Sequence, residues 1–572
     1  MIKLKKFANS KTLLVVIILL ASFLRLYNLA NVPPHLTPDE ASLGYNAYSI
    51  LKTGKDEYGK FMPIIFKSFG DYKPGLYIYA TVPFVVIFGL NETAVRLPSA
   101  ISGIVAVYLV YLIVRKLFAN EDQKAKNVYS LVVGLLLAIS PWHIHFSRGA
   151  WEINLALTLT LAGIYFFFAG LDKQKYLMLS AAFFALTFVT YQGAKLSTGI
   201  VIIVLTLLYW RDLFKLKAKG LLVPVFIGFL VSLPIILSLF SGKTGRLAVF
   251  SVFSYPRPQE YIQTFLDQGG EKIGSLDYYL FHSEGYNFLR GVLGRYFNHF
   301  SARFLFFYGD WQNPRHSPPN QGEFLIADVF LLISGLIVFL KEKMSREKLF
   351  VFLWMLLAPL SAALSRDQVH AVRSFNMLIP MIVINSFGLV WIFNALKSLK
   401  LPVLRSLVFV FAIFFYVGNF VYFIDAYFVH LPKHDSKYWE YGYKQIVETV
   451  IPIQNNYQKV LVQQSYAQPY IYFLFYGASL NPQKYDPAKY QASAKLRESE
   501  TGDVGQVENL DNIVFGAIDW SVNRGDKGNL IVGDTVRIPD ADSVSQAEFK
   551  LIKEIKYLNG KDTAFKIVEV KE

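Results

Sequence analysis

The chain has 572 residues, of which 53% are hydrophobic, 16% aromatic and 17% charged. This composition excludes an ordinary soluble globular protein, in which charged residues make up about 25%. The chain contains no cysteine, which excludes disulfides and thiolate metal sites. Its formal net charge is +15, but Lys and Arg form short clusters between apolar segments. That pattern is typical of membrane topology, so we expect a lipid bilayer and no nucleic acid among the partners.

The first apolar segment follows a basic N-terminus that contains Lys3, Lys5 and Lys6. A secretory signal peptide has the same order of segments. Here Arg25 interrupts the apolar run, and no clear small-x-small cleavage site follows it. We therefore expect an uncleaved anchor whose N-terminus is cytoplasmic.

Mainly apolar segments of about 17 to 25 residues can cross a bilayer. If every such segment crosses, the basic clusters between them all fall on one side, which the positive-inside rule makes cytoplasmic. The sequence thus predicts an α-helical polytopic membrane protein of the cytoplasmic membrane with about eleven transmembrane helices. The predicted spans are 12–29, 94–117, 128–147, 153–171, 176–192, 197–211, 220–240, 324–340, 349–364, 374–395 and 402–428.

One further apolar run, residues 76–89, is shorter than a typical span. If it crossed the membrane, the basic clusters would no longer all lie on one side. We predict that it is a juxtamembrane or interfacial helix. Two loops then lie on the extracytoplasmic face: loop 1, about residues 30–93, and the long loop, about residues 241–323.

The chain changes character after residue 430. Residues 459–463, 512–516 and 529–533 resemble strands, residues 438–450 resemble an amphipathic helix, and Asn559-Gly560 is a hairpin signal. We predict a membrane domain over 1–430 and a small extracytoplasmic α/β domain over 431–572. The aromatic-rich segments 435–443 and 468–476 either pack against the membrane domain or recognise an acceptor.

Loop 1 carries an acidic pair, Asp39-Glu40, directly after Thr37-Pro38. A carboxylate this close to a bilayer is costly to desolvate, which favours a chemical role. The same residues also resemble a helix start, where acidic groups favour the positive end of the helix dipole. We expect Asp39 to act in chemistry, whereas both interpretations stay open for Glu40.

Several motifs together resemble the polytopic GT-C glycosyltransferases, in particular their protein O-mannosyltransferase and aminoarabinose transferase branch. The motifs are Asp39-Glu-Ala after Pro34, Asp71-Tyr-Lys-Pro-Gly-Leu-Tyr, Asn91-Glu-Thr-Ala-Val-Arg-Leu-Pro-Ser and Arg115-Lys-Leu-Phe. The resemblance covers about residues 10–200 well and the rest of the membrane part loosely.

This resemblance implies that a sugar passes from a polyprenyl-phosphate carrier to an acceptor at the extracytoplasmic face. It implies that Asp39 is the general base or orients the acceptor, and that Lys73 lies near the lipid phosphate. Gly75 replaces the second proline of the family's Lys-Pro-Pro element. Glu152 is the matching second acid in a later loop.

The leaving phosphate needs fixed cations near the headgroup plane. Besides Lys73, we identify Arg373, Arg148, His370 and His316 as candidates, because they border predicted spans on the extracytoplasmic side. Arg373 lies in a His-Ala-x-Arg element found in bacterial relatives. Snorkelling at a helix end is the alternative for each arginine, and we expect Arg96 to be an interfacial anchor.

The sequence thus predicts an inverting hexosyl- or pentosyltransferase of the cell envelope. Its donor is a polyprenyl-phosphate sugar, and its acceptor is a protein, a lipid or a polysaccharide. Asp39, Glu40, Glu152 and the imidazoles also have the chemistry to hold a divalent metal ion, although other branches work without one. The alternatives are an envelope glycan polymerase, a lipid-linked-sugar flippase or transporter, and a membrane scaffold. We find no internal repeat, which weighs against a transporter.

Overall fold

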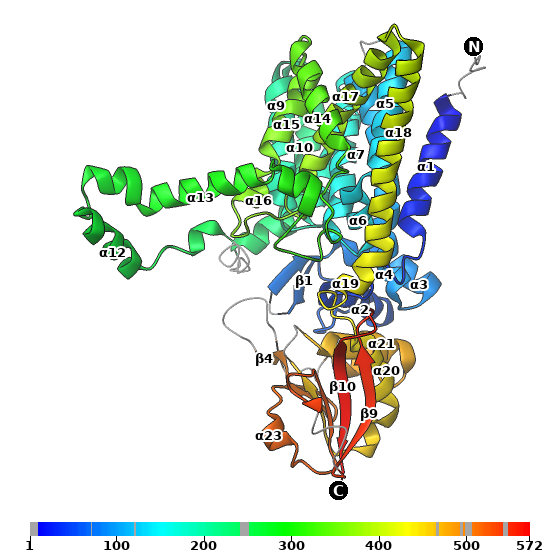
Figure 1. The fold of residues 1–572 in the computed structure, drawn as a ribbon, viewed down its shortest axis with the longest axis vertical. Coiled ribbons are helices and arrows are strands. Elements are labelled where there is room, and N and C mark those ends of the chain that lie inside the picture. The colour runs from blue at the N-terminus through cyan, green and yellow to red at the C-terminus, as the bar shows by residue number, and fades with distance from the viewer. Residues whose placement is uncertain are drawn as a thin grey trace.

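The computed structural model describes residues 10–69, 71–118, 122–240, 251–464, 468–491, 496–497, 506–540 and 547–571. Apolar helices stand side by side and form a bundle, and a sheet domain lies at one end of it (Figure 1). Loop 1 lies between the two parts, and the two chain ends lie at opposite ends of the molecule. The bundle contains α1 (Ser10–Leu26), α4 (Glu92–Leu117), α5 (Gln123–Ile139), α6 (Pro141–Arg148), α7 (Glu152–Asp172), α8 (Tyr176–Phe188), α9 (Ala194–Phe214), α10 (Ala218–Phe240), α14 (Asp328–Lys341), α15 (Arg346–Leu357), α16 (Leu360–Ala363), α17 (Leu378–Ser398) and α18 (Pro402–Asp425).

In the described part of the chain, 6 helices are long and apolar enough to cross a membrane, which agrees with a multi-pass membrane protein. They are Glu92–Leu117, Glu152–Asp172, Ala194–Phe214, Gly220–Leu237, Phe375–Ser398 and Pro402–Asp435. The bent pair α5 and α6, with an angle of 56°, adds another span if it is counted as one.

Every predicted span contains a helix, but several of these helices are short, among them four that are not part of the bent pair. The lengths of α1, α8, α14 and α15 are 17, 13, 14 and 12 residues. A straight helix needs about 20 residues to cross the hydrocarbon core. The predicted total of about eleven crossings is therefore not confirmed by the helix lengths.

Loop 1 folds into α2 (Pro38–Thr53), the antiparallel strands β1 (Ile65–Ser68) and β2 (Asp71–Pro74), and α3 (Leu76–Phe88). A capping box starts α2, because Thr37 accepts a hydrogen bond from the Glu40 amide and the Glu40 carboxylate accepts one from the Thr37 amide. The apolar run after Gly75 forms α3, which has 13 residues and is shorter than a span.

The long loop carries α12 (Gln259–Gly269), α13 (Glu284–Asn298) and two π-helical turns, Tyr278–His282 and Arg303–Tyr308. Helices α12 and α13 reach sideways from the bundle (Figure 1). Residues 241–250 of the predicted long loop lie outside the described residues.

The C-terminal part is an α/β domain with a six-stranded sheet in the order β6-β7-β3-β8-β10-β9. The predicted strands are confirmed as β3 (Val460–Gln463), β7 (Ile513–Gly516) and β8 (Leu530–Gly533), with β3 parallel to both neighbours. The Asn559-Gly560 turn joins the last two strands. The remaining elements are α19 (Leu431–Asp435), α20 (Tyr443–Ile453), α21 (Tyr470–Leu480), α22 (Pro487–Tyr490), α23 (Trp520–Asn523), β4 (Leu496–Arg497), β5 (Gln506–Val507), β6 (Asn509–Leu510), β9 (Phe549–Lys556) and β10 (Thr563–Val570).

The predicted helix 438–450 begins later than expected, at Tyr443. Glu440 has φ 54° and Gly442 has φ 122°, so this segment turns before the helix starts. Left-handed backbone of this kind carries no periodic pattern in the sequence, which is why the boundary was missed.

Helix α21 packs directly on loop 1. The Tyr472 hydroxyl donates to the Leu36 carbonyl at 2.9 Å, and the Tyr470 hydroxyl donates to the Glu57 carboxylate at 3.2 Å. At Gly44 of α2, an added Cβ would lie 2.5 Å from the side chains of Phe475 and Val95. The aromatic segment 468–476 therefore packs against loop 1, as the first of its two interpretations expects.

Candidate active site

Asp39 and Lys73 form an ion pair, as their shared place in loop 1 allows. Asp39 lies in the first turn of α2, where the helix dipole favours a carboxylate, and its side chain is 59% exposed. Lys73 comes from β2, and its side chain is only 7% exposed. A buried cation therefore pairs with a carboxylate that is largely exposed to solvent.

Glu40 is turned inward and is 4% exposed. Its carboxylate accepts hydrogen bonds from the Arg96 Nε at 3.1 Å, the Ala150 amide at 2.8 Å and the Thr37 amide at 2.9 Å. These bonds connect α2 to α4 and to the turn before α7. Of the two interpretations left open for Glu40, the geometry favours a positioning role.

Arg96 is completely buried, so the expectation of an interfacial anchor is wrong. Its terminal nitrogens donate to the carbonyls of Leu29, Pro33 and His35, at 3.0, 2.9 and 2.7 Å, and its Nε binds Glu40. Arg96 thus fixes the chain that leads into α2. Its place in the Asn91–Ser99 motif was a signal for such a role.

Arg148 is also completely buried, and the prediction that it binds donor phosphate does not fit its surroundings. Its terminal nitrogens donate to the carbonyls of Leu24, Tyr27 and Val32, at 2.9, 2.7 and 3.0 Å. The guanidinium also lies 4.7 Å from the centre of the Phe428 ring. Backbone carbonyls occupy these donors, so Arg148 holds the turn after α1.

Glu152 is the first residue of α7 and is half-buried. Two residues earlier, the Ala150 amide binds Glu40, and the neighbouring Trp151 ring lies 5.5 Å from the His316 ring. The turn that carries Glu152 therefore connects the Asp39 region to a second polar group.

That second group joins two loops that are far apart in the sequence. His316 comes from the long loop and His370 from the loop before α17, and their ring centres are 4.9 Å apart. Arg373, on the same loop as His370, donates to Asp367 at 2.8 Å and has a side chain that is 16% exposed. The structure thus brings together His316, His370 and Arg373, which the sequence analysis named separately.

Asp310 belongs to this group and was missed from the sequence. It follows Gly309, whose φ of 60° and whose close approach to Ser317 leave no room for a side chain. The Asp310 side chain is fully buried, and its Oδ2 lies 2.7 Å from the His316 Nδ1. Burial acts to raise the pKa of Asp310, but the hydrogen bonds from His316, Ala371 and Asn313 lower it overall.

Glu440 is a second acid that was missed, because an isolated acid in an aromatic segment shows no pattern. The Tyr472 hydroxyl donates to its carboxylate at 2.9 Å. Burial raises the pKa of Glu440 to about 7, against the opposing effects of Arg315 and Tyr472, and the negative charge of Asp39 raises it further. The C-terminal domain therefore places an acid within the electrostatic reach of Asp39.

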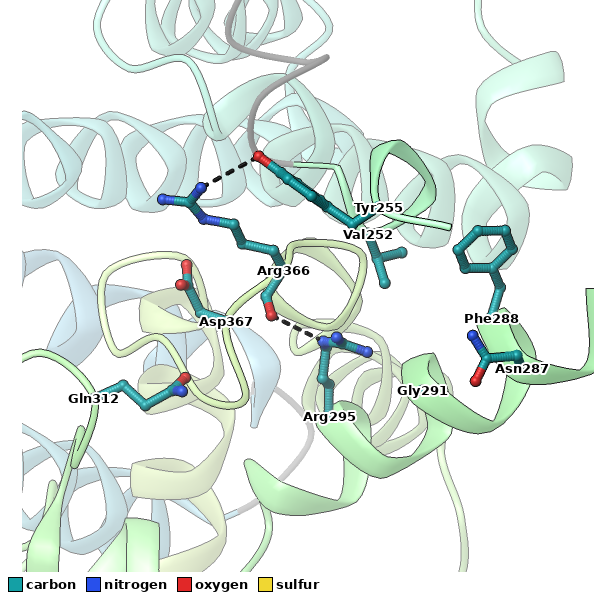
Figure 2. A pocket seen from close by; sticks show the side chains of 9 residues that line it. All are labelled: Val252, Tyr255, Asn287, Phe288, Gly291, Arg295, Gln312, Arg366 and Asp367. Atoms are coloured by element: carbon teal, nitrogen blue, oxygen red, sulfur yellow. Dashed lines mark hydrogen bonds between the residues drawn. The ribbon is translucent and has the colours of Figure 1, made fainter. Parts of the chain in front are cut away.

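A pocket of about 370 Å³ lies beside the His370 loop. Figure 2 shows Arg366 pointing to the Tyr255 hydroxyl and Arg295 pointing to the Arg366 carbonyl, each at 3.3 Å. Asp367, which binds Arg373, lines the same pocket. Two further guanidiniums thus add positive charge next to the group of His370 and Arg373.

The sequence suggested that Asp39 and Glu40 help to hold a metal ion. In the structure Asp39 pairs with Lys73, and Glu40 accepts hydrogen bonds from several N–H groups. Within the described ranges, the cluster whose composition suits a metal is Asp310, His316 and His370, with one ligand atom from each lying within 4.8 Å of the others. The hydrogen bonds within this cluster decide whether it can bind a metal ion.

Comparison with known proteins agrees with this architecture. Residues 73–237 match the family model described as dolichyl-phosphate-mannose-protein mannosyltransferase. YkcB, a protein of Bacillus subtilis (strain 168) whose name assigns it as a mannosyltransferase, is 25% identical over 183 residues. The match covers 32% of this chain and only 24% of the length of YkcB.

Two crystal structures of ArnT from Cupriavidus metallidurans are similar over 98% of this chain and 97% of theirs. The apo form has a TM-score of 0.50 and 15% identity, and the form bound to undecaprenyl phosphate has a TM-score of 0.53 and 13% identity. At these identities the likeness concerns the fold. The chain thus shares the fold of ArnT, and its residues 73–237 are similar to the dolichyl-phosphate-mannose-protein mannosyltransferase family.

Proposed function

We propose that the protein is a membrane glycosyltransferase that moves a sugar, with inversion, from a polyprenyl-phosphate-linked donor to a hydroxyl acceptor. The observation that carries this proposal is the exposed Asp39 carboxylate held at the start of α2 by the buried Lys73. The fold of ArnT, one of whose structures is bound to undecaprenyl phosphate, supports the class of donor.

In this mechanism Asp39 takes the proton of the acceptor hydroxyl as its oxygen bonds to the anomeric carbon. The bond between that carbon and the phosphate oxygen breaks, and the phosphate takes the electron pair. Lys73, His370 and Arg373 stabilise the negative charge that develops there. Glu40 and Arg96 hold α2 and loop 1 in place, and Glu152 lies at the turn that joins the two groups.

The proposed orientation puts loop 1, the long loop and the C-terminal domain on the extracytoplasmic face. The basic clusters at the other end of the bundle support it through the positive-inside rule, and the N-terminus is then cytoplasmic. The acceptor, whether protein, lipid or polysaccharide, approaches from the side of the C-terminal domain, where Glu440 lies.

The test is transfer from a panel of radiolabelled polyprenyl-phosphate sugars by the purified full-length protein in nanodiscs. We expect Asp39→Asn to lower transfer at least about a hundredfold, because general base catalysis contributes about 10² to 10⁴. Asp172→Asn is the matched control, since Asp172 is exposed and pairs with Lys116 on a different part of the bundle.

A well-folded Asp39→Ala protein with full activity would contradict the role of Asp39 in this mechanism. The anomeric configuration of the product tests inversion separately, because retention requires a covalent or front-face route that a single base does not provide.

A further inference from the structure

The Asp310, His316 and His370 cluster has a fixed pattern of hydrogen bonds. On Asp310, Oδ1 accepts from the Asn313 amide at 3.2 Å and the Asn313 side chain at 3.0 Å. On the same carboxylate, Oδ2 accepts from the Ala371 amide at 2.8 Å and faces the His316 Nδ1 at 2.7 Å. These contacts use all four lone-pair positions of the carboxylate.

The His316 tautomer follows from this pattern. Asp310 is ionised, because the bonds it accepts lower its pKa, so the His316 Nδ1 must carry the hydrogen of their shared bond. Among the hydrogen bonds found in the described part of the chain, the His316 ring takes part through Nδ1 and not through Nε2. This is the arrangement in which a buried aspartate orients an imidazole and stabilises its protonated form.

The His370 ring has the opposite orientation. Its Nδ1 accepts from the Arg373 amide at 3.3 Å, so a neutral His370 carries its hydrogen on Nε2. The His370 amide in turn donates to the His299 Nε2 at 3.1 Å, which holds the loop. His370 is therefore a fixed N–H donor.

This pattern argues against a metal at the cluster as it stands. A metal needs a free lone pair from each ligand, but Asp310 has none left and the free nitrogen of His370 bears a hydrogen. Only the His316 Nε2 stays available, and one nitrogen is too few to hold a divalent ion. A donor phosphate suits the same groups, because both rings can donate N–H to oxygen once His316 is protonated.

We propose that His316 is the general acid of the transfer reaction, that Asp310 is its positioning residue, and that His370 binds the same phosphate through its Nε2 hydrogen. This rests on the proposed function. When the anomeric carbon–oxygen bond breaks, its electron pair stays on the phosphate oxygen, and the proton on the His316 Nε2 passes to the departing phosphate. Asp39 gains the acceptor proton, and solvent returns a proton to His316 after release.

Several charged or titratable groups lie around His316. The groups are Asp310 from the turn after the second π-helical turn, Arg315 on the same loop, His145 from α6, and His370 with Arg373 and Asp367 from the loop before α17.

The experiment measures the pH dependence of kcat/KM with the donor that the panel identifies. In the wild-type protein, we expect activity to fall at alkaline pH, because the proposed transfer needs a proton on the His316 Nε2. We expect His316→Gln to lower kcat about 10²- to 10⁴-fold and to remove this alkaline limb. His434→Gln is the control, because the His434 side chain is 68% exposed, and it should keep the wild-type profile.

Asp310→Asn separates proton affinity from simple packing. Removing a negative charge next to the imidazole should move the alkaline limb down by about one to three pH units. A purely structural role would lower activity without moving the limb. Thermal unfolding and binding of undecaprenyl phosphate confirm that each variant is folded.

Two results would overturn the inference. The first is an alkaline limb that persists unchanged in a folded His316→Gln protein. The second is a bound divalent metal, present at one per chain in the wild type and lost in His316→Gln, measured by elemental analysis after dialysis against chelator. If Asp39→Asn abolishes transfer in the same assays, the proposed function stands although the role of His316 fails.

Discussion

The neighbouring acids Asp39 and Glu40 occupy opposite environments. The Asp39 side chain is 59% exposed and pairs with one lysine, whereas Glu40 is 4% exposed and accepts bonds from two loops and a helix. One residue of sequence thus separates a group that can meet substrate from a group that holds the fold.

This contrast predicts losses of stability that differ in size. We expect Glu40→Gln to lower the free energy of unfolding by about 3 to 5 kcal/mol, because it leaves the buried Arg96 guanidinium without its charge partner. Asp39→Asn should cost less than Glu40→Gln, since the Asp39 side of the ion pair is 59% exposed and solvent screens part of the loss. Thermal unfolding in detergent compares the two, and equal losses would contradict the assigned roles.

The sequence indicated Asp39, Lys73, His316, His370 and Arg373 because their residue types and positions beside apolar segments match the chemistry. It misjudged Arg96 as an interfacial anchor, because a sequence places an arginine near a span end but does not show which carbonyls it binds. The carbonyl partners of Arg148 were likewise not visible in the sequence. Asp310 was missed because its contacts with Asn313, His316 and the Ala371 amide form only when the long loop folds against the loop before α17.

At the scale of elements, the contact between α2 and α21 positions the whole of loop 1. Gly44 allows it, because any side chain there would meet Phe475 and Val95. The helices themselves could be predicted from apolar runs and caps. Their packing could not, because the partners are more than four hundred residues apart.

We predict that Gly44→Ala lowers both the melting temperature and the transfer rate, because overpacking costs about 1 to 3 kcal/mol and shifts α2. Gly418→Ala in α18 is the matched control, since an added Cβ there meets nothing within 4 Å. The control should be neutral or slightly stabilising, because alanine favours helix. A wild-type melting temperature for Gly44→Ala would show that α21 does not constrain α2.

At the scale of the molecule, Glu57 makes the stability of the interface between loop 1 and the C-terminal domain depend on pH. Burial raises the pKa of Glu57 to about 7 from 4.5, against hydrogen bonds from Asn46 and Tyr470. The folded protein thus holds this proton more tightly than the unfolded chain. Its contribution to stability is complete below about pH 4.5 and is lost as the pH rises through about 7.

We therefore expect Glu57→Gln, which stays neutral, to gain stability relative to the wild type as the pH rises from 5 to about 8. The difference in melting temperature between the two proteins across this range is the measurement. Glu260→Gln, on the exposed α12, is the control. A difference that does not change with pH would contradict a buried, protonated Glu57.

The bond between Tyr472 and Leu36 spans 436 positions of the chain. During synthesis, loop 1 is made long before α21, so α2 lacks its contact with α21 for most of translation. The proposed active centre is then completed only after α21 has been made and has packed on loop 1. A chain truncated before α21 would lack this contact with loop 1, so we expect its α2 to be poorly positioned.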